Sequence, residues 1–491
     1  MGREEEIIKE REKKIHELKK AGINPYAYSF DKKNLVGDCL KAGIGSKVKT
    51  AGRIMSKRNI GKITFSDLMD FTGKVQLVFQ DKETPGKDFE FFRRYIDIGD
   101  IVGVEGKIIR TKTGQQSILV KNIKLLTKSI LPLPDKWHGL QDKEERYRKR
   151  YLDLIMNPEI RKVFMKREKI IDIVREFLKG ENFVEVETPM LQSIYGGASA
   201  KPFKTYLNAL NIDLFLSISP ELYLKRLVVG GYDRVFTICK NFRNEGIDSF
   251  HNPEFTMMEY YAAYKNYEYH IWFTENLFRE LKKKLDIKNT VEYQGKKISL
   301  KLPFKRIKFR DLLLKETGID IDKANDFEKL KKEILNKKLT KVDIKGRHHY
   351  GSLIDELYKR VVRLKIIQPT FLTHYPIEMI ALAKRNEEDP RKINSVQLLI
   401  DGTEIVKSYD ELNDPIDQEK RLKEQANLLG RGDEEAMPMD EDFINALKVG
   451  MPPTAGYGLG IDRLVMILTN QPSIRDVILF PFMKQDKKLD L

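Results

Sequence analysis

The sequence predicts an α+β protein in which a small β-barrel comes first and a larger domain of strands and flanking helices follows. Three observations lead to this prediction. Short strand-like runs fill residues 47–130, a proline-punctuated linker occupies 131–141, and long helical runs mixed with strand-like ones follow from 142 to 491. At 491 residues the chain is too long for one hydrophobic core, so we expect two or three domains.

The first 46 residues are predicted to form a helix and a lead-in to the barrel. Apolar residues recur with helical spacing among charged ones over 3–21, and Gly22 ends the pattern. This segment lacks the apolar stretch of a secretory signal, and no apolar run of the chain is long enough to span a membrane. Cys39 and Cys239 are far apart without a metal-site or disulfide pattern, which suits a reducing compartment. We therefore expect a cytoplasmic protein with no membrane contact.

Residues 47–130 contain five short strand-like runs, separated by turns that contain glycine. An OB-fold is the small barrel that fits this pattern in a basic protein. Binding of single-stranded nucleic acid on such a barrel needs an exposed aromatic ring and polar groups on the sheet face, and Phe65 and Gln76 can supply them. A single phenylalanine in a small barrel more often belongs to the core, so a core position of Phe65 is the alternative.

A formal net charge of +16 indicates a polyanionic partner, because clustered Lys and Arg attract phosphate backbones. Many of the lysines fall in residues 281–346, which we expect to be a helical, Lys-rich insertion. The solvated faces of such helices explain these lysines as well as a nucleic-acid surface does.

The stretch KNFRNEGIDSFHNPEF at 240–255 lies between two runs rich in β-forming residues and predicts a hairpin. Alternate residues of a strand share a face, so Arg243 and Glu245 should point the same way. The residues of the second strand that should share a face are Phe255, Met257, Glu259 and Tyr261. Charged and aromatic side chains thus converge on one side of the hairpin.

Three motifs occur in order: ETPML after a long helix at about 159–179, FRNEG followed by HNPEF, and GYGLGIDR opening an apolar helix. Together they resemble the three signature motifs of class II aminoacyl-tRNA synthetases. Longer segments, among them SPELYLKRLVVGG and DEDFINALKVGMPPTAG, narrow the resemblance to lysyl-tRNA synthetases, from residue 22 to about 483. The resemblance implies an OB-fold anticodon-binding domain at 47–130 and an antiparallel-sheet catalytic domain at 142–491.

The resemblance also implies an activity: ATP-dependent formation of lysyl-adenylate, then transfer of lysine to the 3′ end of tRNA(Lys) by a homodimer, with Mg²⁺ accompanying ATP. Arg243 and Arg463 are the implied catalytic residues. The planar fork of Arg243 suits this chemistry, because it can hold a carboxylate and a phosphate together. The positions implied for ATP are Arg243, Glu245, His251, Phe255, Glu404 and Arg463. For the anticodon they are Phe65 and Gln76, while Asn122 stands where an acidic contact is common.

A substrate ammonium group leaving water needs opposite charge and hydrogen bonds. The positions that the resemblance implies for lysine are Glu221, Glu259, Tyr261, Lys407, Tyr409 and Glu411. Glu259 lies in a strand that is otherwise predicted to be buried, where an unpaired carboxylate would be costly.

Two residues depart from the family pattern. Gln397 stands where the family has one of two metal-holding glutamates, the other matching Glu404, and this should weaken Mg²⁺ binding unless Asp401 substitutes. Glu411 is a further open candidate for the metal. Lys407 replaces a usual Asn and either repels the substrate ammonium or holds the substrate carboxylate; the second interpretation is favoured. A regular strand would place Lys407, Tyr409 and Glu411 on one face and Glu404 on the other, unless a bulge intervenes.

Two alternative functions remain open on the sequence. One is a diverged paralogue with another amino-acid substrate, for which Lys407 and Ile380 would be the discriminating residues. The other is an RNA-binding protein with a decayed catalytic domain, which Gln397 supports. The retention of Arg243, Glu404 and Arg463 argues against decay.

Overall fold

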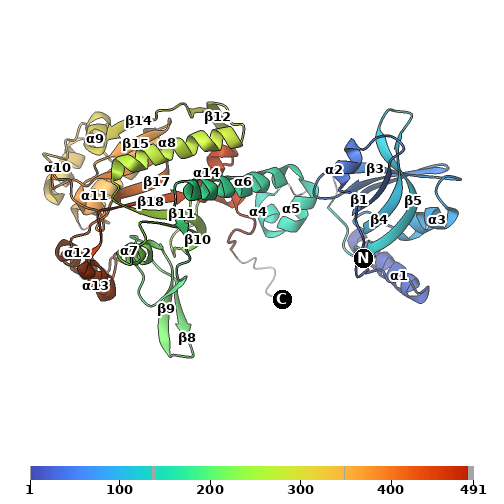
Figure 1. Cartoon of the computed structure of the whole chain (residues 1–491), viewed down its shortest axis with the longest axis horizontal. Coiled ribbons are helices and arrows are strands. Elements are labelled where there is room, and N and C mark those ends of the chain that lie inside the picture. Colours follow the sequence, from blue (N-terminus) through green and yellow to red (C-terminus); the bar gives the residue numbers. More distant parts are fainter. Residues whose placement is uncertain (1, 135–139, 141, 348, 485–491) are drawn as a thin grey trace. The chain divides into compact units, whose positions relative to one another are not determined.

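The computed structural model describes residues 2–134, 140, 142–347 and 349–484. The chain forms two compact units, Met1–Gln141 and Asp142–Leu491, and each is described by itself (Figure 1). Within the described ranges, no helix has the length and apolar character needed to cross a membrane. Half of the predicted linker, residues 135–139 and 141, lies outside the described residues.

The first unit is a closed five-stranded barrel in the order β1-β2-β3-β5-β4. Its elements are α1 (Arg3–Lys20), α2 (Val36–Lys41), β1 (Lys47–Ile60), β2 (Ile63–Met69), β3 (Lys74–Gln80), α3 (Gly86–Tyr95), β4 (Ile101–Arg110) and β5 (Gln116–Thr127). The OB-type barrel predicted from the five strand-like runs is confirmed. Helix α3 was not predicted; it packs Phe89 and Phe92 into the barrel core.

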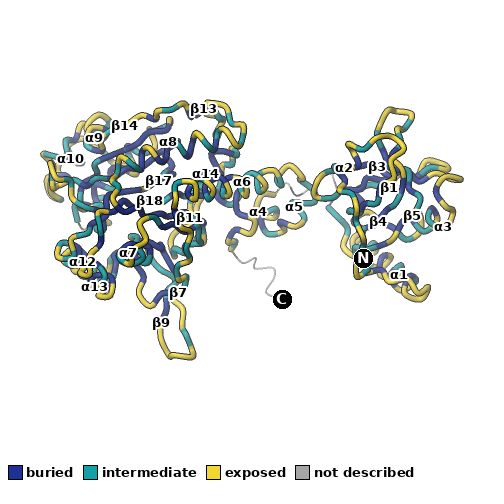
Figure 2. Tube along the Cα trace, viewed as in Figure 1, coloured by how far each residue is buried: buried dark blue, intermediate teal, exposed yellow. Residues whose placement is uncertain are grey.

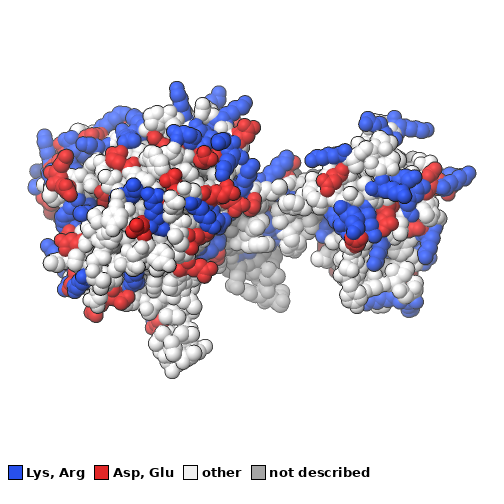
Figure 3. Space-filling view, in the orientation of Figure 1, with Lys and Arg blue, Asp and Glu red and all other residues white. Residues whose placement is uncertain are grey.

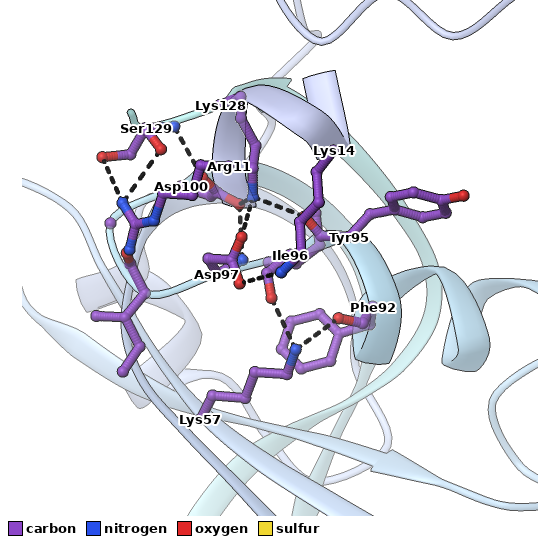
Figure 4. A network of polar contacts seen from close by, with 12 residues as sticks. Arg11, Lys14, Lys57, Phe92, Tyr95, Ile96, Asp97, Asp100, Lys128 and Ser129 are labelled. Carbon is purple, nitrogen blue, oxygen red and sulfur yellow. Dashed lines mark hydrogen bonds and ion pairs between the residues drawn. The ribbon is translucent and has the colours of Figure 1, made fainter. Parts of the chain in front are cut away.

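Helix α1 is held on the barrel by a polar network as well as by its apolar face (Figure 4). The Nζ atom of Lys128, 2% exposed, lies 2.5 Å from Asp97 and 2.7 Å from Asp100. Lys14 of α1 reaches Asp97 at 2.8 Å, and Arg11 donates to the backbone oxygen of Ile98 at 2.8 Å. A buried cation is tolerated when it is paired and hydrogen-bonded, so this network fixes where α1 docks.

Lys57 of β1 closes the C-terminal end of α3 in the same region (Figure 4). Its Nζ atom donates to the backbone oxygens of Phe92, Arg93 and Ile96 at 3.0, 2.8 and 2.7 Å. The last carbonyl groups of a helix have no partner within the helix, and an ammonium group satisfies them well. Burial lowers the pKa of Lys57 to about 8.

The second unit is built on an eight-stranded sheet in the order β14-β15-β16-β17-β18-β11-β10-β6. The strands of this sheet are β6 (Val184–Glu185), β10 (Arg234–Phe242), β11 (Glu254–Ala263), β14 (Lys305–Lys308), β15 (Thr370–Thr373), β16 (Ser395–Ile400), β17 (Thr403–Asp410) and β18 (Thr454–Gly460). The two outermost pairs, β14–β15 and β10–β6, are parallel, and all inner pairs are antiparallel. The predicted antiparallel core of this domain is thus confirmed.

Helices cover both faces of the sheet, and the central strands are buried (Figure 2). One face packs against α6 (Glu159–Gly180), α8 (Tyr267–Lys284) and α14 (Ile461–Leu468). The other packs against α7 (Glu221–Val229), α9 (Phe309–Thr317), α10 (Phe327–Asn336), α11 (Tyr350–Leu357) and α13 (Glu441–Gly450). The remaining elements are α4 (Lys143–Arg148), α5 (Arg150–Met156), β7 (Leu191–Gln192), β8 (Lys204–Leu207), β9 (Ile212–Leu216), η1 (Tyr358–Val362), η2 (Arg363–Lys365), η3 (Ile377–Met379), α12 (Pro415–Gly430) and α15 (Ile474–Val477).

The Lys-rich segment 281–346 is not the purely helical insertion that we predicted. Besides α9 and α10 it contains the hairpin of β12 (Thr290–Tyr293) and β13 (Lys296–Ser299), and β14, the edge strand of the main sheet. The hairpin turns at Gln294 and Gly295, which both have positive φ as a two-residue turn of the primed type requires. The many lysines concealed the short alternation of apolar residues that marks these strands.

Candidate active site

A cavity of about 430 Å³ opens on the sheet face that α7, α11 and α13 partly cover. It has the size of a small-molecule site. Apart from Asp401, named as a substitute metal ligand, the site residues predicted in the second unit all line it: Glu221, Arg243, Glu245, His251, Phe255, Glu259, Tyr261, Gln397, Glu404, Lys407, Tyr409, Glu411 and Arg463. Residues more than two hundred positions apart in the sequence thus meet in one place.

The floor of the cavity is formed by three glycines of β18, at positions 456, 458 and 460. Alternate residues of a strand share a face, so GYGLG places all three on the cavity side. A Cβ atom on Gly456 would overlap the Glu411 carboxylate and lie 2.6 Å from the ring of Tyr261. The missing side chain at Gly456 therefore makes room for the Glu411 carboxylate and the Tyr261 ring within the cavity.

The hairpin of β10 and β11 places the predicted charged and aromatic side chains along one wall. Phe255, Met257, Glu259 and Tyr261 of β11 all line the cavity, as their alternation predicted. Arg243 follows the last residue of β10, and its backbone N–H donates to the oxygen of Pro253 at 2.9 Å, which extends the hairpin. The guanidinium group lies 5.1 Å from the centre of the Phe255 ring, and its Nε atom is buried without a partner in the described structure.

A β-bulge decides the side on which Glu404 lies. The register of β16 and β17 shifts between Leu398 and Leu399, so that Ile405 is the extra residue on β17. Glu404 consequently faces the cavity together with Lys407 and Tyr409, which an unbroken strand would have prevented.

One end of the cavity is acidic and deeply buried. Glu221, Glu259 and Glu411 are between 1% and 5% exposed. The hydroxyl group of Tyr409 donates to both carboxylate oxygens of Glu221, at 2.9 and 2.8 Å. Such a cluster of carboxylates suits a ligand that carries an ammonium group, because burial makes an unpaired negative charge costly.

Sequence reasoning missed Lys225, the counter-ion of this acidic end. Its fully buried ammonium group pairs with Glu221 at 2.6 Å and with Glu411. Burial alone would lower the pKa of Lys225, but the two carboxylates outweigh it and the pKa is raised. The only sequence signal was the spacing of four between Glu221 and Lys225 on α7, which is also common on solvated helices.

Glu259 has no cation partner among the described residues. It accepts a hydrogen bond from the Ser219 hydroxyl at 3.0 Å and a long one from Tyr261 at 3.5 Å. Burial, and then the nearby charge of Glu221, raises the pKa of Glu259 to about 8. This carboxylate is the acidic group that most needs an external cation.

The other end of the cavity is cationic. Arg463, the third residue of α14, donates to the backbone oxygen of Glu404 and to Nε2 of His251, both at 3.2 Å. His251 Nδ1 lies 2.8 Å from Asp248, so its N–H donates there and Nε2 accepts from Arg463. Burial lowers the pKa of Arg463 from its usual value, as expected where several guanidinium groups meet. In this arrangement His251 orients Arg463.

Arg363 is a second residue that sequence reasoning missed. It lines the cationic end directly after the π-helix η1, a type of irregular turn that often occurs at functional sites. Its Nε atom is buried without a partner among the described residues. Nothing in the surrounding sequence YKRVVRLK distinguishes this arginine from the other basic residues of the segment.

The candidate metal ligands are poorly arranged to hold an ion. Gln397 Oε1 accepts a hydrogen bond from Tyr375 at 2.5 Å, and Glu411 is paired with Lys225. Asp401, a proposed substitute, pairs with Lys296 at 2.6 Å and does not line the cavity. Over the described ranges, no group of three or more His, Cys, Asp or Glu side chains is placed to bind a metal.

The barrel carries the predicted anticodon residues on its outer face. In register, Phe65 of β2 pairs with Val78 of β3, and Asp67 with Gln76, so Phe65 and Gln76 share a face. Phe65 is half-buried and is not part of the barrel core, so the alternative of a core position is wrong. Gln76 is largely buried and accepts a hydrogen bond from Ser117 at 3.0 Å.

Comparison with known proteins agrees with this geometry. Residues 142–484 match the class II tRNA synthetases (D, K and N), and residues 48–126 match the OB-fold nucleic acid binding domain. A lysine–tRNA ligase from Pelotomaculum thermopropionicum is 46% identical over 489 residues, covering 98% of this chain and 96% of the relative. The chain belongs to the class II lysine–tRNA ligase family.

Other relatives in the lysine–tRNA ligase family are as similar. One from Aquifex aeolicus is 50% identical over 442 residues, which cover 90% of this chain and 74% of the relative. Lysine–tRNA ligase 2 of Methanosarcina mazei is 47% identical over 479 residues, covering 96% of this chain and 93% of the relative. The resemblance found in the motifs is confirmed, and the chain is an aminoacyl-tRNA synthetase of a family that uses ATP as substrate.

Proposed function

We propose that this protein is a lysine–tRNA ligase, which activates lysine with ATP to lysyl-adenylate and transfers it to the 3′ end of tRNA(Lys). The observation that carries the proposal is the polarity of one cavity, with buried carboxylates at one end and guanidinium groups at the other. A lysine side chain fits the acidic end, and the phosphates of ATP fit the cationic end. No predicted site residue of this domain is displaced from the cavity, so nothing favours a decayed domain or another substrate.

The acidic end selects the amino acid. Glu259 and Glu411, with Tyr261, receive the side-chain ammonium group, while Glu221 and Tyr409 lie at the α-amino group. Opposite charge compensates the desolvation of the ammonium group, which otherwise costs several kcal/mol. An uncharged side chain of similar length would leave Glu259 unpaired and bind poorly.

The cationic end carries the chemistry. The lysine carboxylate attacks the α-phosphate of ATP in line, diphosphate leaves, and negative charge accumulates at the phosphorus atom.

The residues of the cationic end divide the binding of the two substrates among them. Arg243 bridges the lysine carboxylate and the α-phosphate, Arg463 holds the terminal phosphates, and Lys407 contacts the carboxylate. Glu245 accepts from the adenine amino group, Phe255 stacks on the ring, and His251 orients Arg463. Positioning and charge stabilisation lower the barrier without a side-chain nucleophile. Glu404 is the carboxylate that would contact a Mg²⁺ ion bound to the phosphates of ATP, and such an ion would neutralise part of their charge.

The barrel at 47–130 is proposed to bind the anticodon of tRNA(Lys), through stacking on Phe65 and hydrogen bonds from Gln76. The catalytic domain, 142–491, would receive the acceptor end. Lys and Arg side chains gather over both units on the face shown in Figure 3, including the edge near β12 to β14, which suits a phosphate backbone. A cytoplasmic location agrees with such a partner.

A homodimer is proposed from a second cavity of about 1210 Å³ beside α6 and β10. Its lining is largely apolar and includes the exposed side chains Ile247, Phe480 and Phe482. Exposed apolar patches of this kind mark interaction sites, and a second copy of the chain would cover this one. Sedimentation of the purified protein tests the dimer.

The experiment for the function is ATP–diphosphate exchange with each of the standard amino acids. Lysine alone should support exchange, and Glu259→Gln should remove it while ATP binding persists. Exchange with another amino acid but not lysine would show a changed substrate, and absence of exchange with all of them would refute the proposal.

A further inference from the structure

The cationic end of the cavity has more fixed positive charge than its neighbouring carboxylate can balance. Arg363, Lys407 and Arg463 all line it, and Glu404 lies 3.9 Å from Arg463. Lys407 is exposed to the cavity, and neither Lys407 nor Arg363 has an ion pair within the described residues. Unpaired cations that point into a cavity are arranged for an anionic ligand.

The sheet register places Lys407 next to the position that a metal ion bridging the two strands would take. Gln397 of β16 and Lys407 of β17 are direct cross-strand partners, and the bulge brings Glu404 to the same face. Side chains of such partners lie about 5 Å apart at their Cβ atoms. A divalent cation held between positions 397 and 404 would therefore have the positively charged Lys407 side chain as a neighbour in the cavity, and like charges repel.

Gln397 is also a poor ligand for such an ion. Its side-chain oxygen is already hydrogen-bonded to the Tyr375 hydroxyl at 2.5 Å, and it carries no charge. Mg²⁺ prefers charged oxygen ligands and gives up its water reluctantly. On these two strands Glu404 is then the one carboxylate left for an ion among the described residues, and a single carboxylate can contact an ion carried by a nucleotide but is too little to hold one alone.

We propose that no metal ion bridges β16 and β17 in this chain, and that Arg363 and Lys407 join Arg463 in binding the phosphates of a nucleoside triphosphate directly. The inference rests on the proposed function, because it assigns ATP to this end of the cavity. With lysine and ATP bound as proposed, Lys407 would contact both the substrate carboxylate and the α-phosphate, so its ammonium group would supply charge at the reacting centre. The divalent cation present is the one that ATP brings.

Direct binding of Mn²⁺, followed by electron paramagnetic resonance, tests the first half of the proposal. Without nucleotide, the protein should show no saturable Mn²⁺ site at submillimolar concentration. The double variant Q397E/K407N removes the ammonium group and restores a second carboxylate, so it should bind Mn²⁺ at least about tenfold more tightly. A tight Mn²⁺ site in the unaltered protein that is lost in Glu404→Gln would overturn the proposal.

Calorimetric titration with ATP in the presence of EDTA tests the second half. Metal-free ATP should bind the unaltered protein within about fivefold of its affinity in Mg²⁺, and Arg363→Gln or Lys407→Asn should weaken metal-free binding at least about tenfold. The matched control is Lys359→Gln: Lys359 lines the same cavity but is paired with Asp355 at 2.6 Å, so its loss should change ATP affinity less than twofold. Equal losses in Lys407→Asn and the control would refute the assignment, provided circular dichroism shows both variants folded.

The two proposals fail in different ways. Lysine-dependent diphosphate exchange together with ATP binding that EDTA abolishes would leave the function intact and remove the inference. Metal-free ATP binding that depends on Arg363 and Lys407, without exchange for any amino acid, would keep the inference and remove the function.

Discussion

The two ends of the cavity differ in how their charges are balanced before any ligand arrives. At the acidic end, Lys225 already pairs with two of the three carboxylates, and Tyr409 and Ser219 donate hydrogen bonds. At the cationic end, buried Nε atoms of Arg243 and Arg363 have no partner among the described residues. The fold thus neutralises Glu221 and Glu411 and leaves only Glu259 for a cationic ligand, whereas the cationic end is completed only by a ligand.

The difference follows from the cost of burial. Carboxylates that are nearly inaccessible to water must be neutralised by the protein itself, or the folded state becomes unstable. The side chains of Arg243, Arg363 and Arg463 are only half-buried, so their guanidinium groups keep some hydration and can remain without an anion until a phosphate binds. Substitutions at the acidic end should therefore mainly lower the free energy of unfolding. Substitutions at the cationic end should mainly weaken ligand binding and slow the reaction.

Lys225→Met should have the largest effect, and at the acidic end. Removing the ammonium group leaves Glu221 and Glu411 buried and uncompensated, which should cost about 3–5 kcal/mol of unfolding free energy. Urea unfolding at neutral pH measures the loss. The double variant K225M/E411Q should recover part of it, and a single variant as stable as the parent would show that the pair does not balance this end.

Glu259→Gln should change how the stability of the protein depends on pH. The pKa of Glu259 is about 8 in the folded protein and near 4.5 when unfolded, because burial disfavours the charged carboxylate. The folded state therefore holds its proton more tightly, and stability should fall as pH rises from about 4.5 through 8. The variant lacks this loss, so it should be no more stable than the parent at pH 4.5 and about 3–5 kcal/mol more stable at pH 9, since each pKa unit corresponds to about 1.4 kcal/mol.

Thermal unfolding at both pH values measures that effect, and lysine titration provides a second readout. Lysine should bind the unaltered protein more weakly as pH falls below 8, since protonated Glu259 cannot pair with an ammonium group. A stability difference that is the same at pH 4.5 and pH 9 would contradict the raised pKa.

The smallest expected effect lies in the other unit, outside the comparison. Phe65→Ala removes a half-buried ring from the outer face of the barrel and should weaken tRNA binding by about 1 kcal/mol, as loss of one stacked base does. Lysine-dependent diphosphate exchange should not change. Filter binding with the variant Phe89→Leu, which alters the barrel core, controls for loss of fold.

Much of the site could be predicted from the sequence because motif residues lie at fixed positions on regular strands. Arg243, Glu259 and Arg463 were found because they stand in motifs that resemble those of the family, and strand alternation independently predicted the face on which Glu259 lies. The side on which Glu404 lies could not be predicted, because the bulge at Ile405 leaves no mark in the letters VQLLIDGTEIVK. The barrel was predicted for the same reason as the hairpin: its strands alternate and are separated by glycine turns.

Lys225 and Arg363 were missed for another reason. Each looks like an ordinary surface residue in its own segment, and its role arises only from groups brought near it by tertiary folding. The strands β12 and β13 were missed because lysines fill the positions between their few apolar residues. Local sequence patterns therefore identified the charged residues of the motifs, but not the charged residues outside the motifs that lie beside them in the folded protein.

The three glycines of β18 line the floor of this pocket with backbone atoms, which cannot change position as side chains can. A wall made of side chains can rotate to admit a bulkier guest, but a bare backbone held in a sheet by neighbours on both sides has no rotamers to change. The width of the pocket on this side is consequently constant. Directed evolution toward wider substrates would have to remodel the opposite wall.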